Sequence, residues 1–296
     1  MARTVLLLQL RPAPGSCPAK FFNKILQLRA KIPYEQRFHS EIGNSRISVE
    51  QINENAVMLL TKGPHVQRRL GTEEHRAWKT TRVYEIIGNH PRLVRFLGRD
   101  PWTALPTLEK PYATLAGFLE EHYSAMYAPR GGMALQLLSE LSFIHSKDVI
   151  LGDLHIYTCW LQSPDSIAIL GFLNAVYMEP MHAIRYTNDT WGSEYNFPFH
   201  PCLIPGKGTG PGGRWDRDTA TIQTDLFLWA SLLYGLLTGS WPVSGQARDN
   251  CWDYGYGNAD EVKRDLGKFL VRKEWGVGGV EGDEIKGLDV VHILAS

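Results

Sequence analysis

The sequence contains little cysteine and no excess of charge of either sign. Lysine plus arginine equals aspartate plus glutamate at 31 each among 296 residues. A neutral balance gives no reason to expect nucleic acid or an anionic membrane as partner. No two cysteines form a C-x-x-C pair, so neither a disulfide framework nor a zinc site is indicated. Such scattered thiols are typical of a cytoplasmic or nuclear protein; they are Cys17, Cys159, Cys202 and Cys251.

Long hydrophobic runs are also missing. The apolar start of the chain is interrupted at Gln9 and ends at Arg11, without a small-residue cleavage site in register. We therefore interpret it as an extension rather than a signal peptide. The apolar run from Leu226 to Leu237 has twelve residues, too few to span a bilayer. The apolar fraction of 44% is ordinary for a globular protein and can fill a large core. The sequence thus predicts no membrane partner.

The stretch from Phe143 to Leu161 reads as an apolar helix end, a short strand and a polar loop. It contains Leu151-Gly152-Asp153, and Thr158 follows Asp153 by five residues. This stretch resembles the catalytic loop of the protein kinase-like superfamily, where His-Arg-Asp is followed five residues later by Asn. In those enzymes the Asp accepts the substrate hydroxyl proton and the Asn holds a metal ion. The resemblance implies that Asp153 is a remnant of the catalytic-loop Asp, with Thr158 in the Asn position.

Three further segments resemble fungal-type kinase domains, so the resemblance covers residues 40 to 272 in outline. They are Arg82 to Gly98 with its His-Pro pair, Thr221 to Pro242, which resembles the central helix of the large lobe, and Asn250 to Leu266. In the family, the Asp of the central helix ties the catalytic-loop backbone to that helix. The resemblance implies this structural role for Asp225.

The segment from Thr107 to Leu119 resembles the kinase hinge and the helix that follows it. The resemblance implies that Leu108 gates the back of a nucleotide pocket and that Glu109 is the first hinge residue. In the family, the third hinge residue donates a hydrogen bond to adenine. Here that position is Pro111, which has no N–H group.

Most catalytic groups of the family are replaced in this chain. The replacements are Leu59 or Leu60 for the phosphate-binding Lys, Gly171 for the metal-binding Asp and Thr80 near the ion-pairing Glu. Lys62 either substitutes for the missing Lys or is a solvated loop residue. A positioned base contributes about 10²–10⁴-fold in rate, whereas enzymes usually reach about 10⁶-fold or more. Asp153 alone therefore does not predict a working kinase.

We predict an α+β, two-lobed protein-kinase-like fold with a small sheet-rich N-lobe and a larger, mainly helical C-lobe. The predicted units are an N-terminal extension (1–38), the N-lobe (39–108), a hinge near 109–112, the C-lobe (113–272) and a Gly-rich tail (273–296). Between Pro242 and Asn250 kinases place one or two helices. The short connection here indicates either lost helices, which would truncate the C-lobe after its central helix, or a degraded gene product.

The favoured function is that of a catalytically impaired kinase-like domain, a pseudokinase, which acts by binding or scaffolding a protein partner without a metal or cofactor. The alternative is an active atypical ATP-dependent protein kinase that uses Asp153 and Lys62, with ATP and magnesium. A further alternative is a non-functional truncated gene product. The candidate residues are Asp153 (catalytic remnant), Lys62, Leu108 and Glu109 (nucleotide-binding) and Asp225 (structural).

Overall fold

The computed structural model describes residues 39–41, 47–61, 73–101, 104–122, 129–170, 172–179, 184–186, 221–238, 256–272, 276–279 and 281–286. Within these ranges the protein combines helices with small antiparallel sheets, so the α+β class is confirmed. Lys62, Gly171 and Pro242 lie outside the described residues, as do the N-terminal extension and the connection that follows Pro242.

The largest sheet has five strands in the order β1-β2-β3-β5-β4, and all neighbouring pairs are antiparallel. Its strands are β1 (His39–Glu41), β2 (Ile47–Asn53), β3 (Ala56–Thr61), β5 (Pro106–Glu109) and β4 (Phe96–Arg99). The Asn53 side-chain oxygen accepts a hydrogen bond from the Asn55 N–H at 2.9 Å, which closes the β2–β3 turn.

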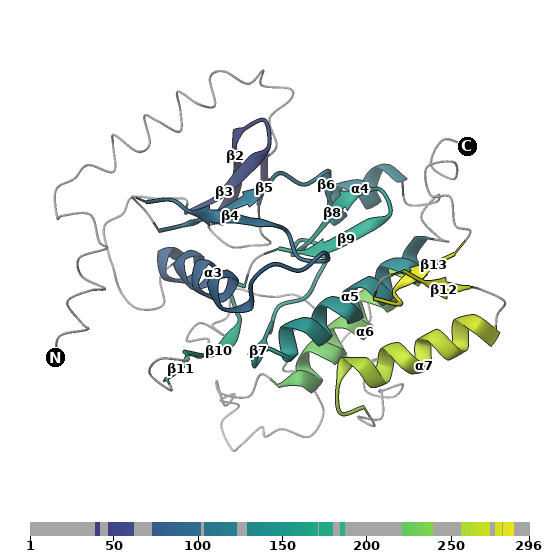
Figure 1. Ribbon diagram of the computed structural model, residues 1–296. Coiled ribbons are helices and arrows are strands. Elements are labelled where there is room, and N and C mark those ends of the chain that lie inside the picture. Colours follow the sequence, from purple (N-terminus) through teal and green to yellow (C-terminus); the bar gives the residue numbers. More distant parts are fainter. Residues whose placement is uncertain are drawn as a thin grey trace, which may run out of the picture.

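The first described helix, α3 (Glu73–Ile87), packs against β3 and β5 (Figure 1). Residues three or four apart along it are buried and form one apolar face, comprising Ala77, Thr80, Tyr84 and Ile87. The helix ends at Gly88, whose N–H bonds to the Tyr84 carbonyl at 3.0 Å. The φ of 75° at Gly88 lies in the left-handed region that glycine adopts at low cost.

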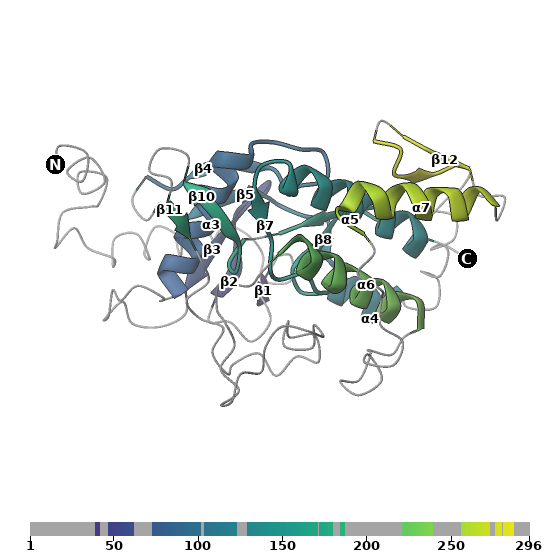
Figure 2. The ribbon, with the colours of Figure 1, turned by 90° about the horizontal axis from the view of Figure 1, so that it is seen from below.

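The described residues form four further helices: α4 (Leu115–His122), α5 (Pro129–His145), α6 (Ile222–Thr238) and α7 (Ala259–Arg272). Figures 1 and 2 show α7 running beside α5, and α5 also packs against α6. The Trp229 indole N–H of α6 donates a hydrogen bond to the Ala134 carbonyl of α5 at 3.0 Å. α6 begins with reciprocal hydrogen bonds in which the backbone N–H groups of Thr221 and Thr224 donate to each other's hydroxyls. These two bonds cap the start of α6, so the Asp225 carboxylate is not needed as its cap.

The remaining described strands form three small antiparallel sheets. The first contains β6 (Ala113–Thr114), β8 (Cys159–Ser163) and β9 (Ser166–Ile169), and the second contains β7 (Val149–Ile150), β10 (Val176–Glu179) and β11 (Ile184–Tyr186). The third is the hairpin of β12 (Val277–Gly278) and β13 (Glu284–Ile285), which packs against α5 and α7. The Gly-rich composition of this tail did not predict a packed hairpin.

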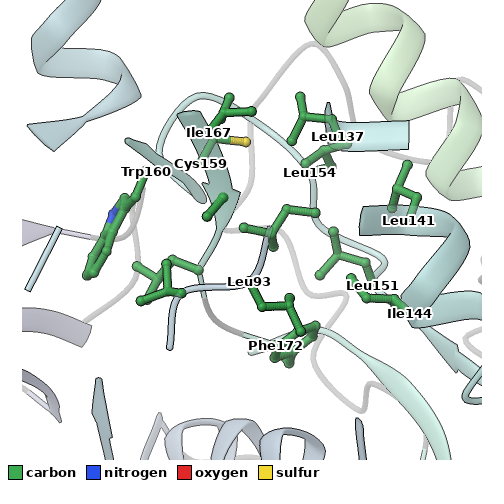
Figure 3. Packing of buried hydrophobic residues seen from close by; sticks show 14 of the residues in the cluster. Leu93, Leu137, Leu141, Ile144, Leu151, Leu154, Cys159, Trp160, Ile167 and Phe172 are labelled. Atoms are coloured by element: carbon green, nitrogen blue, oxygen red, sulfur yellow. The ribbon is translucent and has the colours of Figure 1, made fainter. Parts of the chain in front are cut away.

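One buried apolar cluster extends from the five-stranded sheet to the helices. Figure 3 shows Leu151 and Leu154 packed among buried side chains that include Leu93 and Phe172. Leu151 and Leu154, which lie on either side of Asp153 in the sequence, thereby anchor the polar loop in the core. Within the described ranges, no helix is both long enough and apolar enough to cross a membrane.

Candidate functional site around Asp153

The loop from Leu151 to Thr158 is tied to α6 by Asp225. The Asp225 Oδ2 atom accepts a hydrogen bond from the Leu151 N–H at 2.8 Å, and Oδ1 accepts one from the Gly152 N–H at 2.7 Å. Asp225 has no solvent-exposed surface. Gly152 has a φ of 69°, a conformation that favours glycine at the position before Asp153. Asp225 therefore joins the backbone of this loop to α6.

The Asp153 carboxylate is held by two neighbouring side chains. Its Oδ2 atom accepts a hydrogen bond from the Asn174 amide at 2.5 Å, and Oδ1 lies 3.0 Å from His155 Nε2. The Tyr157 N–H donates to His155 Nδ1 at 3.1 Å. Each Asp153 oxygen thus faces a protein group, and the Asp153 side chain is only 13% exposed.

Thr158 uses its hydroxyl inside the loop. The Thr158 Oγ1 atom accepts a hydrogen bond from the His155 N–H at 3.0 Å and lies 3.1 Å from the Asp153 carbonyl, to which it donates. The side chain is buried. Thr158 therefore stabilises the loop conformation. Among the described residues, no group of three or more His, Cys, Asp or Glu side chains is placed to bind a metal ion.

α3 contacts the segment that follows β9 through a neutral hydrogen bond. The Phe172 N–H donates to the Thr80 hydroxyl at 3.3 Å. The Tyr84 ring meets Phe172 edge-on, with 5.1 Å between ring centroids, and stacks on Phe96 at 5.4 Å. This column of three aromatic rings links β4, α3 and the Phe172 segment. The resemblance implies an ion-pairing Glu near Thr80. Thr80 instead has a hydroxyl that accepts a hydrogen bond from the Phe172 backbone.

Two side chains of α5 bind the free edge of β9. Gln136 Oε1 accepts a hydrogen bond from the Ile167 N–H at 2.9 Å, and one turn later the Glu140 carboxylate accepts one from the Ile169 N–H at 2.9 and 3.0 Å. Glu140 is fully buried. Burial raises the pKa of Glu140 well above its usual range, although the hydrogen bond from Ile169 and the charge of Arg92 oppose this shift.

Cys159 lies on β8, in the interior. Burial, followed by the charges of Glu140 and Asp153, raises the pKa of its thiol well above the usual range. A thiol in this state is a poor nucleophile. Cys159 is therefore a core residue and not a candidate for covalent catalysis.

The backbone N–H groups of residues 109 to 112 are already used within the protein. Glu109, Lys110 and Tyr112 each donate a hydrogen bond to a backbone carbonyl, and Pro111 has no N–H group. The accepting carbonyls belong to Arg95, Asn55 and Leu161, at 2.9, 2.9 and 2.8 Å respectively. A nucleotide base placed beside this segment would find no free backbone donor in it.

The strand register places Leu59 and Leu108 on one face of the sheet. Val57 lies opposite Leu108, and Leu59, two residues further along β3, lies on the same face of the sheet. Leu60 faces the opposite side. Leu59 and Leu108 have no exposed surface, whereas Glu109 is exposed. On this face the structure therefore has buried apolar side chains.

The structure brings Asp153 and Asp225 together at one loop, and it places Leu108 and Glu109 on β5. Sequence reasoning missed Asn174 and Glu140 as polar contacts of this region. Asn174 offered a weak signal, because it is a polar residue in an apolar stretch. Glu140 interrupts an otherwise apolar α5 in the same way.

No protein-family model matches this chain, and no curated protein matches it.

Proposed function

We propose that this chain is a two-lobed, protein-kinase-like protein whose phosphotransfer chemistry is lost, and that it acts by binding or scaffolding a protein partner. The order of elements supports this proposal. A five-stranded sheet with α3 comes first, residues 110 to 114 connect it to α4, and the larger helices follow. The anchoring of the Asp153 loop by Asp225 is the contact that the resemblance implies for such a fold.

The observation that carries the proposal is the hydrogen bonding of residues 109 to 112. A nucleotide-binding hinge must offer backbone groups to a purine base. Here Glu109, Lys110 and Tyr112 have committed their N–H groups to protein carbonyls, and Pro111 has none. Adenine binding would therefore require breaking an internal hydrogen bond. A broken bond leaves a polar group unpaired, at a cost of about 1–3 kcal/mol.

The groups that act on phosphates in a kinase are also replaced by groups without charge. Leu59 is buried on the face that carries Leu108, and Thr80 bonds to the Phe172 backbone. Kinase catalysis depends on lysine and metal charge near the phosphates. Asp153 retains a carboxylate, yet its oxygens face Asn174 and His155. What remains is a stable shape whose surface can bind a partner.

Thermal unfolding with ATP, in the presence and absence of magnesium, tests the loss of nucleotide binding. A ligand at 100 times its dissociation constant stabilises the folded state by about 2.7 kcal/mol. We expect no magnesium-dependent rise in melting temperature with millimolar ATP. A clear rise would contradict the proposal and favour a binding or active kinase.

A phosphotransfer assay with an Asp153→Asn variant tests the enzymatic alternative. Asn keeps the size of the side chain and removes the base. We expect the phosphotransfer signal of the wild type and that of Asp153→Asn both to equal the background of the assay. Glu54→Gln, an equivalent change at an exposed turn, serves as the matched control. Phosphotransfer by the wild type that is lost in Asp153→Asn and kept in Glu54→Gln would establish an active kinase.

A further inference from the structure

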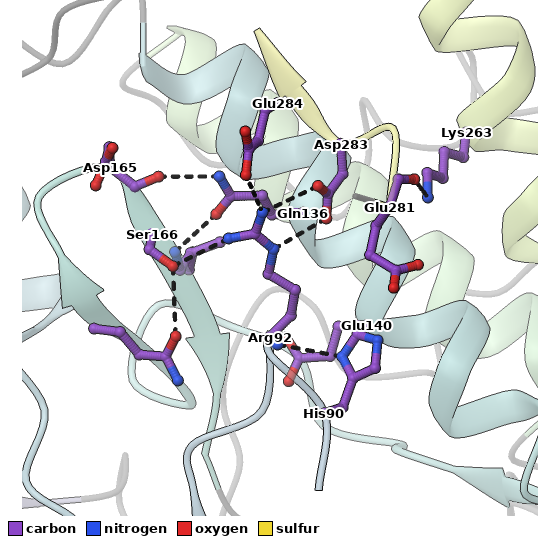
Figure 4. A network of polar contacts seen from close by, with 12 residues as sticks. His90, Arg92, Gln136, Glu140, Asp165, Ser166, Lys263, Glu281, Asp283 and Glu284 are labelled. Carbon is purple, nitrogen blue, oxygen red and sulfur yellow. Dashed lines mark hydrogen bonds and ion pairs between the residues drawn. The ribbon is translucent and has the colours of Figure 1, made fainter. Parts of the chain in front are cut away.

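The β12–β13 hairpin is bound to the rest of the protein by a buried ion pair. We use the term strap for residues 276 to 279 and 281 to 286. The guanidinium of Arg92, in the turn after α3, binds both carboxylate oxygens of Asp283 in the strap: Nε to Oδ2 at 3.0 Å and Nη2 to Oδ1 at 3.0 Å (Figure 4). Asp283 has no exposed surface, and the Arg92 side chain is 12% exposed. This two-point geometry gives both strength and directional selectivity for a carboxylate.

Two more strap residues bind beside Asp283. Arg92 Nη2 lies 3.1 Å from Glu284 Oε1, and Lys263 of α7 donates a hydrogen bond to the Glu281 carbonyl. On its other side Arg92 donates from Nη1 to the Ser166 hydroxyl at 3.2 Å. We use the term socket for Arg92, Ser166 and Lys263. The socket is assembled from the turn after α3, the start of β9 and α7.

The strap resembles a short linear peptide seated in this socket. Its strands have only two residues each, and a two-stranded hairpin of this size is not stable by itself in water. Gly282, with a φ of 64°, allows the turn that brings the adjacent carboxylates of Asp283 and Glu284 onto Arg92. The strap therefore depends on the socket for its conformation, whereas Lys263 lies on α7, Ser166 lies on β9, and the Arg92 side chain is mostly buried.

We propose that Arg92, Ser166 and Lys263 form a receptor for an acidic peptide of a protein partner, and that the strap is the internal competitor that occupies it. The peptide has two adjacent carboxylates, as in the Glu-Gly-Asp-Glu sequence of residues 281 to 284. This inference deepens the binding role proposed above by naming the chemistry of the partner. It does not depend on the nucleotide result.

The covalent link makes the strap a strong competitor. A tethered ligand acts at an effective concentration of about millimolar when its linker is short. A free peptide with the same contacts therefore binds the wild-type chain weakly. Displacing the strap frees the socket, so a partner must either bind more tightly than the strap or present several contacts at once.

The test uses the full chain with Asp283→Lys, which places a like charge against Arg92 and expels the strap. The probe is a fluorescently labelled peptide with the sequence of residues 276 to 286, and binding is measured by fluorescence anisotropy. We expect the peptide to bind Asp283→Lys at least about tenfold more tightly than the wild type, because the internal competitor is gone. Glu54→Lys makes the same charge change at an exposed turn and should bind as weakly as the wild type.

Two comparisons make the result specific. A peptide in which Asn replaces the residue corresponding to Asp283 should not bind the Asp283→Lys chain. The original peptide should likewise not bind a chain that carries Asp283→Lys and Arg92→Gln together. If Asp283→Lys does not fold, Asp283→Asn with Glu284→Gln removes both charges at constant shape and takes its place. Three outcomes would overturn the proposal. They are equal affinity for the two peptides, peptide binding that survives Arg92→Gln, and displacement of the peptide by inorganic phosphate at equal concentration. Failure here would leave the nucleotide measurements unaffected, so the two proposals are tested separately.

Discussion

His145 Nε2 lies 2.8 Å from Asp225 Oδ2, and this pair joins the end of α5 to the start of α6 across 80 residues of sequence. The same carboxylate accepts the N–H groups of Leu151 and Gly152, so three donors converge on one buried side chain. Within the described residues His145 Nδ1 has no hydrogen-bond partner. Asp225 is therefore the only polar contact there for the ring of His145.

Replacing Asp225 should destabilise the fold strongly. Asp225→Ala leaves three donors without an acceptor in the interior, and each unpaired group costs about 1–3 kcal/mol. We expect a loss of at least about 3 kcal/mol in the free energy of unfolding, measured by urea denaturation. Asp153→Ala, at a partly exposed position, should lose less. Equal denaturation midpoints for wild type and Asp225→Ala would contradict the anchoring role.

Restoring a lysine on β3 should not restore nucleotide binding. Leu59→Lys places an ammonium where the side chain has no exposed surface, and burying an unpaired charge is costly. We expect a lower melting temperature and no stabilisation by ATP. Leu59→Met, a volume-conserving change that usually costs less than about 1.5 kcal/mol, is the control. An ATP-dependent rise in the melting temperature of Leu59→Lys would show that this face opens onto a phosphate site.

Glu140 should make the protein less stable as the pH rises. Burial raises its pKa in the folded state, so the folded protein binds this proton more tightly than the unfolded chain. Its contribution is fully present below the unfolded pKa of about 4.3 and is lost as the pH rises through the higher folded pKa. Glu140→Gln keeps an acceptor for the Ile169 N–H and removes the titration. We expect urea denaturation to show a flatter stability profile above pH 4.3 for the variant. Identical profiles would refute the assignment.

His90 should make the protein less stable as the pH falls, which is the opposite direction to Glu140. Burial lowers its pKa, partly opposed by Glu281 and Asp283 and reinforced by Arg92 and Lys263. The unfolded chain therefore takes up this proton first, and stability falls as the pH drops through about 6.5.

The geometry of His90 provides the variant for this test. The Arg92 N–H donates to His90 Nδ1 at 3.2 Å, and the ring stacks on Phe143. His90→Asn keeps an oxygen acceptor near the Nδ1 position and cannot titrate. We expect thermal melts of the variant to change less than those of the wild type between pH 7.5 and 5.5, a window around the unfolded pKa of about 6.5. A wild-type melting temperature that does not fall over this window would count against the effect.

The local features of the fold could be predicted from the sequence. The segment from Thr221, with its apolar run from Leu226 to Leu237, predicted a helix, and α6 spans Ile222–Thr238. The α+β class was predicted through the resemblance to kinase domains, and the described residues agree with that class. Periodicity and turn residues act over a few positions, so sequence alone determines them.

The polar contacts were decided by the tertiary structure. Arg92 and Asp283 are separated by 191 residues, and Asn174 reaches Asp153 across 21. Hydrophobic periodicity does not encode such pairs, since it shows which residues are buried and not which of them meet. From the sequence alone, Asp153 could be picked out only through the resemblance of its loop to a kinase catalytic loop. Only the packed structure decided that Asn174 donates a hydrogen bond to it and that His155 lies beside it, because such contacts form where the core brings distant segments within about 3 Å of each other.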